Sequence, residues 1–314
     1  MSYQIPSKKD LRIVFMGTPE FAVASLEALV NAGYQIVGVV TAPDKPAGRG
    51  MKLTPVPVKK IAMEHGLRLL QPAKLKDPVF LEELRSLKAD LQVVVAFRML
   101  PELVWNMPPL GTINVHGSLL PQYRGAAPIN WAIINGEKET GVTTFKLQHE
   151  IDTGNILLSE SMPIEENDNA GSVHDKMKAL GARLIVKTID ALLSGEIKEI
   201  PQSHIDINDL KHAPKIFTDT CSIDWNQPVE KVQNLIRGLS PYPGAFTTVN
   251  DKMFKIFSSV SHAREHSFTP GKLETDKKSY IRFYCINGYI DCTEIQLEGK
   301  KRMKVEDFLR GNTL

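Results

Sequence analysis

Cysteine is scarce in this sequence of 314 residues, which has only Cys221, Cys285 and Cys292. Their number is odd and none stands in a Cys-x-x-Cys pair, which argues against a disulfide framework and a cysteine-based zinc site. The chain also lacks any apolar run of the ~18 residues that a membrane-spanning helix needs. Because Met1 to Lys9 is polar and has no apolar signal core, we expect a cytoplasmic protein without a membrane partner.

Charged residues make up 24% of the chain, and neither sign dominates, because the net charge is only +2. Residues 211–314 nevertheless contain 16 Lys and Arg against 12 Asp and Glu, whereas the earlier residues are slightly acidic. This difference favours an anionic partner for the second part of the chain without identifying it. The histidines show no metal-ligand spacing, and we expect no metal. We also expect a monomer.

Strand and helix patterns alternate through the first part of the chain, which is typical of an α/β domain with a mostly parallel sheet. Leu11 to Met16 is predicted as a strand that leads into a helix, with Thr18 as its N-cap and Pro19 as its first residue. Further strands are expected at 36–40, 67–70, 90–97, 112–115 and 142–147, and further helices at 58–65, 79–87, 127–134 and 172–193. Residues 41–54 read as a long loop.

The second part of the chain has a different pattern. Residues 198–211 are polar and contain proline, which predicts a linker. A helix is expected at 229–239, followed by short strands at 246–249, 254–257, 280–285 and 294–297, a pattern that suits a small β-barrel. We therefore predict a domain at 1–197, a linker at 198–211 and a second domain at 212–314.

Two short segments carry side chains suited to catalysis. Asn114 and His116 are two residues apart on a predicted strand, so they project to the same side near the end where open α/β sheets place their sites. Asp152 follows a later strand and could reach the same edge of the sheet. The spacing of Asn114 and His116 suits a structural pair equally well, and Asp-Thr-Gly at 152–154 is also ordinary turn chemistry.

Together these three side chains could transfer an acyl group to an amine. Amide and imidazolium groups can stabilise the oxyanion of a tetrahedral intermediate. A histidine oriented by a carboxylate can move protons between the incoming amine and the leaving nitrogen. No nucleophilic serine or cysteine is required.

Several long motifs carry a resemblance to a known family. They are GTINVHGSLLPQYRGAAPINWAI from residue 111, TGVTTF from 140 and IDTGNIL from 151. These segments resemble the 10-formyltetrahydrofolate-dependent formyltransferase family. The opening LRIVFMGTPEFAV, the loop PDKPAGRG and the later IRGLSPYPGAFT and LEGKKRMKVEDFLRG are similar to the members that act on initiator methionyl-tRNA.

The resemblance implies a doubly wound formyltransferase domain followed by an OB-like barrel that binds tRNA. It places Asn114, His116 and Asp152 at the catalytic positions, and 10-formyltetrahydrofolate is then the formyl donor. The folate-binding loop would be formed by Ser118, Leu119, Leu120 and Pro121. The sequence departs from the family pattern at Arg98, where a small residue is usual, and at Glu150, where glycine is common.

Basic residues outside this centre point to the tRNA. Arg49 matches a family residue that enters the tRNA acceptor end, and it stands in a connection longer than the two to six residues usual in α/β units. Lys301 and Arg302 belong to a basic run that could bind phosphates or be a charged surface turn, and Lys215 and Arg237 are weaker candidates for the same face. A formyltransferase acting on a sugar nucleotide or purine intermediate, and a non-catalytic nucleic-acid-binding module, remain alternatives.

Overall fold

The computed structural model describes residues 4–47, 52–202 and 209–312. The chain forms two compact units, each assembled from separate segments of the sequence. The first unit comprises Met1–Arg124, Gly141–Met162 and Asp175–Lys211, and the second comprises Gly125–Thr140, Pro163–His174 and His212–Leu314. The predicted domain limits at 197 and 211 stay a prediction.

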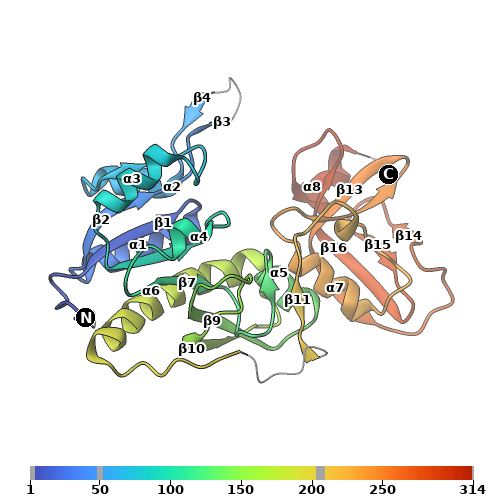
Figure 1. The fold of residues 1–314 in the computed structure, drawn as a ribbon. Helices are drawn as coiled ribbons and strands as arrows, with labels where there is room; N and C mark the ends of the chain where they lie inside the picture. Colours follow the sequence, from blue (N-terminus) through green and yellow to red (C-terminus); the bar gives the residue numbers. More distant parts are fainter. Residues whose placement is uncertain (1–3, 48–51, 203–208, 313–314) are drawn as a thin grey trace. The chain divides into compact units, whose positions relative to one another are not determined.

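A seven-stranded sheet organises the first unit, with strand order β10-β9-β7-β6-β1-β2-β5 (Figure 1). Strands β7, β6, β1, β2 and β5 run parallel to one another, and β9 pairs antiparallel with β7. Their bounds are β1 Arg12–Gly17, β2 Gln35–Val40, β5 Leu69–Leu70, β6 Leu91–Val95, β7 Thr112–His116, β9 Glu139–Lys146 and β10 Ile156–Pro163.

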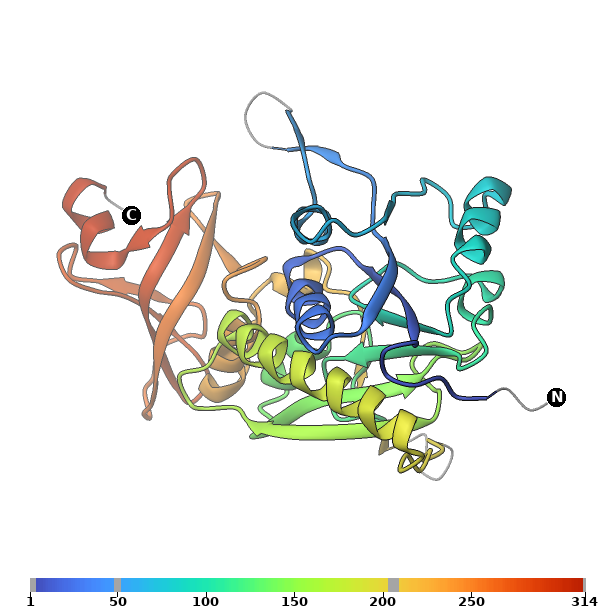
Figure 2. The ribbon, with the colours of Figure 1, turned by 90° about the vertical axis from the view of Figure 1, so that its left-hand side faces the viewer.

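Helices cover both faces of this sheet, which confirms the doubly wound prediction (Figure 2). Val14 and Met16 share a buried cluster with Phe80 of one helix and Val104 of another. Because strand residues alternate between the two faces, Phe15 projects to the opposite side. The helices are α1 Glu20–Asn31, α2 Pro57–Glu64, α3 Pro78–Ser86, α4 Glu102–Trp105 and α6 Ala170–Ser194.

Some local expectations for the first unit were wrong. Helix α1 begins at Glu20, so Pro19 occupies the N-cap position and Thr18 lies one residue too early to cap the helix. The Thr18 hydroxyl instead accepts a hydrogen bond from the backbone N–H of Ala42. The expected loop at 41–54 contains a small antiparallel hairpin formed by β3 Lys45–Ala47 and β4 Lys52–Thr54. Strand β10 and the short helix α4 were not predicted.

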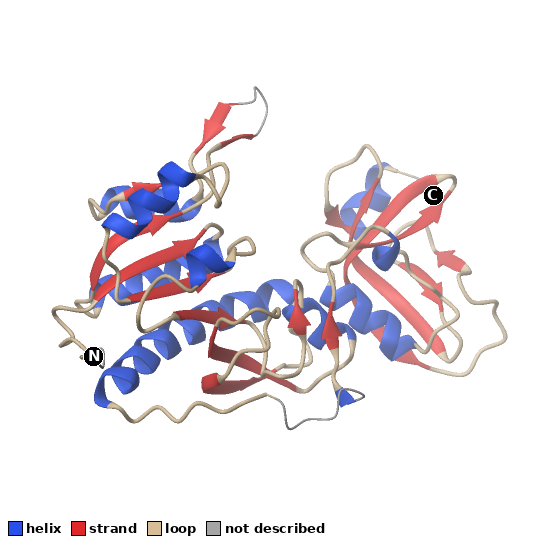
Figure 3. Ribbon diagram, in the orientation of Figure 1, coloured by secondary structure: helices blue, strands red, loops and turns tan. Residues whose placement is uncertain are grey.

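The second unit is built on a curled antiparallel sheet with strand order β12-β13-β16-β15-β14 and β17 beside β16 (Figure 3). Register shifts around Ser258 of β13 increase the twist of the sheet, and the result is a half-barrel, in agreement with the predicted barrel-like domain. Phe254, Phe283 and Phe308 fill its core. Its elements are α5 Pro128–Ile134, α7 Val229–Gly238, β12 Ala245–Val249, β13 Lys252–Ala263, β14 Leu273–Thr275, β15 Ile281–Tyr284, β16 Gly288–Leu297, β17 Met303–Lys304 and α8 Val305–Gly311.

Three short elements complete the described fold. Strand β8 Arg124–Gly125 pairs with β11 His212–Ala213, and a 3-10 turn spans Asp219–Cys221. The three cysteines are buried and not joined by disulfides. Burial raises the pKa of Cys285 to about 12, so this thiol stays protonated at neutral pH.

Candidate active site

Asn114 and His116 lie at the carboxyl end of β7. Asn114 pairs in register with Val94 of β6, which in turn is opposite Met16 of β1. Because side chains opposite each other in a sheet share a face, Asn114 and His116 lie on the face that α3 and α4 cover. The carboxamide of Asn114 is half-buried and makes no hydrogen bond to any residue in the described ranges. It is therefore available to a bound molecule.

The imidazole of His116 is held by a single backbone contact. Its Nε2 lies 2.9 Å from the carbonyl oxygen of Tyr123, and the side chain is almost completely buried. Because a carbonyl oxygen can only accept, Nε2 must carry the hydrogen of this bond. In the neutral ring the other nitrogen, Nδ1, then has a free lone pair that can take a proton.

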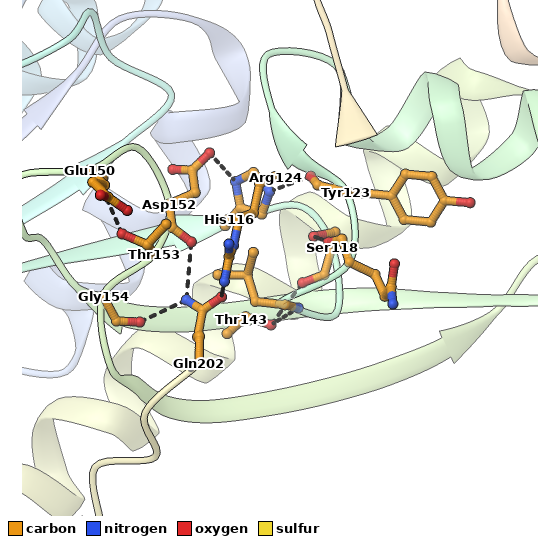
Figure 4. A network of polar contacts seen from close by, with 12 residues as sticks. His116, Ser118, Tyr123, Arg124, Thr143, Glu150, Asp152, Thr153, Gly154 and Gln202 are labelled. Atoms are coloured by element: carbon orange, nitrogen blue, oxygen red, sulfur yellow. Dashed lines mark hydrogen bonds and ion pairs between the residues drawn. The ribbon is translucent and has the colours of Figure 1, made fainter. Parts of the chain in front are cut away.

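Asp152 supplies a carboxylate on the Nδ1 side of this ring (Figure 4). Its Oδ2 lies 3.8 Å from Nδ1 of His116, and the two side chains are 15% and 8% exposed. This distance is too long for a direct hydrogen bond. It is short enough for the carboxylate to stabilise an imidazolium strongly where little water screens the pair.

The loop after β7 is fixed mainly by Thr143 of β9. The hydroxyl of Thr143 donates to the carbonyl of Ser118 at 2.8 Å and accepts from the N–H of Leu120 at 3.1 Å. The buried hydroxyl of Ser118 donates to the carbonyl of Gln122 at 2.6 Å, inside the loop. Of the four predicted folate-binding residues, Leu119 and Pro121 keep part of their surface exposed.

The geometry can therefore perform the chemistry that the motifs suggested. The site combines three groups beside a loop of fixed shape. They are the Asn114 carboxamide, the buried His116 imidazole with its Nδ1 lone pair, and the Asp152 carboxylate. Two family profiles account for nearly the whole described chain: "Formyl transferase" matches residues 11–189, and "Formyl transferase, C-terminal domain" matches residues 215–313. The chain belongs to the formyl transferase family.

Similar proteins agree with this assignment. The methionyl-tRNA formyltransferase of Bacteroides fragilis is 56% identical over 310 residues, which cover 97% of this chain and 96% of the relative. That of Parabacteroides distasonis is 57% identical over 312 residues, with the same coverage. Among solved structures, the sugar 3N-formyl transferase WlaRD, determined with dTDP and 5-N-formyl-THF, has a TM-score of 0.68 at 20% identity over 93% of this chain and 99% of its own. This last likeness shows the fold.

Two features are absent from the part of the chain that the structure describes. No group of three or more His, Cys, Asp and Glu there could hold a metal ion. No helix within the same residues is long and apolar enough to cross a membrane.

The candidate tRNA-binding residues differ in how the structure presents them. Arg49 lies outside the described residues. Lys301 is exposed, whereas Arg302 is ion-paired with Glu294 and lies 4.2 Å from the centre of the Phe257 ring. The charge of the Arg302 guanidinium is therefore partly neutralised by Glu294 in this formyl transferase.

Arg237 does not behave as the phosphate contact that its charge suggested. Its Nη1 donates to the backbone carbonyls of Glu165, Glu166 and Asp168. Burial lowers the pKa of its guanidinium. Arg237 thus anchors the segment before α6, and the prediction of phosphate contact was wrong because the sequence does not reveal the carbonyls that surround it.

Of the two departures from the family pattern, the structure explains Arg98 by its side-chain hydrogen bonds and does not explain Glu150. The guanidinium of Arg98 donates to the carbonyls of Pro72 and Ala73 and so ties the loop after β6 to the loop after β5. Glu150 has an exposed side chain, and its carbonyl accepts a hydrogen bond from the hydroxyl of Thr153 at 3.1 Å. Arg98 and Glu150 are thus both part of loop structure in this formyl transferase.

Two residues beside the centre were not predicted from the sequence. Arg124 belongs to the PQYRG segment, and burial lowers the pKa of its guanidinium, although the nearby Asp152 and Glu150 carboxylates act in the opposite direction. Gln202 stands in the predicted linker and contacts both Arg124 and the Asp152 turn. The motif could have pointed to Arg124, but a lone glutamine in a polar segment gives no signal.

Proposed function

We propose that this formyl transferase moves the formyl group of 10-formyltetrahydrofolate to the amino group of methionyl-initiator tRNA. The products are N-formylmethionyl-tRNA, used to initiate translation, and tetrahydrofolate. The observation that carries the proposal is the identity of 56–57% over nearly the full length with relatives named methionyl-tRNA formyltransferase. The candidate site supplies the chemistry that this reaction needs.

In the proposed mechanism the neutral amino group attacks the formyl carbon. A new C–N bond forms, and negative charge develops on the formyl oxygen, which the Asn114 carboxamide stabilises by donating a hydrogen bond. Nδ1 of His116 takes the proton that the amine loses, and the Asp152 carboxylate stabilises the resulting imidazolium. When the bond from the formyl carbon to N10 of the folate breaks, His116 returns the proton to the leaving nitrogen.

We propose the folate contacts along the loop at 118–121. The Ser118 hydroxyl is already bonded within the loop, so its role is to shape the loop. The partly exposed apolar side chains of Leu119 and Pro121 then offer a surface for a flat heterocycle, and the buried Leu120 helps to shape the loop. Arg49, Lys301 and Arg302 are the proposed contacts to tRNA.

We further propose that the enzyme works in the cytoplasm, where initiator tRNA is used, and that it does so as a monomer. The proposed functional division is a catalytic domain at 1–197, a linker at 198–211 and a tRNA-binding domain at 212–314. Sedimentation equilibrium tests the monomer, because a dimer would double the apparent mass.

A substrate comparison tests the function directly. The purified protein is incubated with 10-formyltetrahydrofolate and one of three acceptors: initiator methionyl-tRNA, elongator methionyl-tRNA or a nucleotide-linked amino sugar. The His116→Ala variant is assayed in the same way as the control. We expect N-formylmethionine, detected by mass spectrometry after deacylation, mainly from initiator methionyl-tRNA and at much lower rate with His116→Ala. Formylation of the amino sugar alone would replace the proposed acceptor, and a wild-type rate in a folded His116→Ala variant would remove His116 from the mechanism.

A further inference from the structure

Gln202 uses its whole hydrogen-bonding capacity between two loops of the candidate site. Its Nε2 donates to the carbonyl of Asp152 at 3.0 Å and to the carbonyl of Gly154 at 2.7 Å. Its Oε1 accepts from Nε of Arg124 at 3.1 Å and from Nη2 of the same guanidinium at 2.8 Å (Figure 4). A carboxamide has two N–H donors and two acceptor lone pairs, so all four are occupied. The side chain is 7% exposed.

The turn that Gln202 holds has an unfavourable backbone. Asp152 has a φ of 56°, in the left-handed region that an L-residue seldom adopts. A Cβ atom at Gly154 would lie only 1.7 Å from the backbone oxygen of Lys146, so the chain is tightly packed two residues later. Strained conformations of this kind persist only where the surroundings fix them. The two donors of Gln202 fix this turn from inside.

Arg124 determines which way round the carboxamide lies. A guanidinium has only donors, so the carboxamide must turn its oxygen toward Arg124 and its N–H groups toward the Asp152 turn. Arg124 also lies in the field of the Asp152 carboxylate. Without Gln202, the guanidinium would lose its acceptor and could pair with that carboxylate directly, drawing it away from His116.

We propose that Gln202 is a positioning residue for formyl transfer. It holds the turn in the conformation that places the Asp152 carboxylate 3.8 Å from Nδ1 of His116, and it keeps Arg124 occupied. The segment predicted as a linker therefore contributes to the catalytic centre. The inference rests on the proposed function, because the role of Gln202 is to support the Asp152–His116 pair.

The chain offers a matched control for this residue. Gln148 also donates a hydrogen bond to the same turn, from Nε2 to the Thr153 hydroxyl at 2.7 Å, but its side chain is exposed and makes no hydrogen bond to Arg124 or Asp152. We expect Gln202→Ala to lower kcat by about 10- to 100-fold, the scale of a small misplacement of a catalytic group. Its KM values for methionyl-tRNA and the folate should change little, and Gln148→Ala should keep kcat within about 3-fold of the wild type.

A double-mutant cycle shows whether Gln202 acts through Asp152. In an Asp152→Asn background, Gln202→Ala should lower kcat by less than about 3-fold, because the group that it positions is already lost. Independent losses that multiply in the double variant would overturn the proposal. So would a Gln202→Ala variant whose kcat matches that of Gln148→Ala.

A second measurement does not depend on the identity of the acceptor. Hydrogen–deuterium exchange of the peptide covering residues 148–156 should be faster in Gln202→Ala than in Gln148→Ala, while a peptide from α3 exchanges equally in both. Equal exchange of the 148–156 peptide would refute the positioning role even in an enzyme with a different acceptor. A wild-type protein that fails to formylate methionyl-tRNA would instead count against the proposed function.

Discussion

The replacement Asp152→Asn isolates the electrostatic part of the proposed mechanism, because asparagine has nearly the same shape as aspartate and no charge. Two unit charges about 4 Å apart attract each other by about 4 kcal/mol at an effective dielectric constant of about 20. The Oδ2 to Nδ1 distance of 3.8 Å fits this case. Since about 1.4 kcal/mol corresponds to a tenfold rate change, the upper limit of the loss is about 10³-fold.

The measured loss in Asp152→Asn should fall between about 10²- and 10³-fold in kcat, because some of the field reaches water through the exposed part of the carboxylate. The assay is formylation of methionyl-tRNA with both substrates saturating, and circular dichroism confirms that the variant is folded. The KM for the folate should stay near its wild-type value. A folded variant that retains more than a third of the wild-type kcat would refute a charge-stabilising role for Asp152.

Four further predictions concern single features of the chain. Asn114→Asp should lower kcat by about 10²-fold or more in the formylation assay, because it places an anion beside the developing oxyanion, and an active variant would exclude that role. Gly154→Ala should lower the thermal unfolding midpoint and abolish most activity, since the added Cβ would lie 1.7 Å from a backbone oxygen; an unchanged melting curve would contradict the packing. Arg49→Ala should impair formylation of methionyl-tRNA and leave folate binding intact. Normal formylation by this variant would exclude a role of Arg49 in binding tRNA. Lys301→Ala should reduce the slope of log tRNA affinity against log salt by about 0.7 to 0.9, and Arg302→Ala by less, because Glu294 already neutralises it; equal slopes in Lys301→Ala and the wild type would exclude a phosphate contact.

The sequence predicted the parallel core of the fold well because its signals are local. The strands that become β1 and β6 are short, mainly apolar runs whose residues are almost all buried, so their type was clear from the sequence. Strand β10 was missed because three of its eight residues are exposed and its Ser-Glu-Ser segment resembles a loop. The N-cap at α1 was misplaced because Thr18 and Pro19 together are compatible with two helix starts one residue apart.

The candidate site was predictable in part for the same reason. Asn114 and His116 stand two apart on one strand, and a period of two is readable from sequence. Gln202 was not readable, since its four bonds join segments that are about 50 and 80 residues away along the chain. The phosphate contact suggested for Arg237 was wrong for the same reason, because the groups that accept its hydrogen bonds are backbone carbonyls of a distant segment.

The segmented composition of the second unit has a consequence for chimeric enzymes. Helix α5 belongs to that unit although it stands some 80 residues before residues 212–314, the largest segment of the unit, and Asn130 and Trp131 of α5 donate hydrogen bonds to the carbonyls of Gly238 and Pro214. A chimera that exchanges only residues 212–314 between relatives would therefore pair α5 from one parent with α7 from the other. Exchanging residues 125–140 and 163–174 together with 212–314 would take the whole second unit from one parent. Such chimeras should therefore fold more often than chimeras with a single crossover before residue 212.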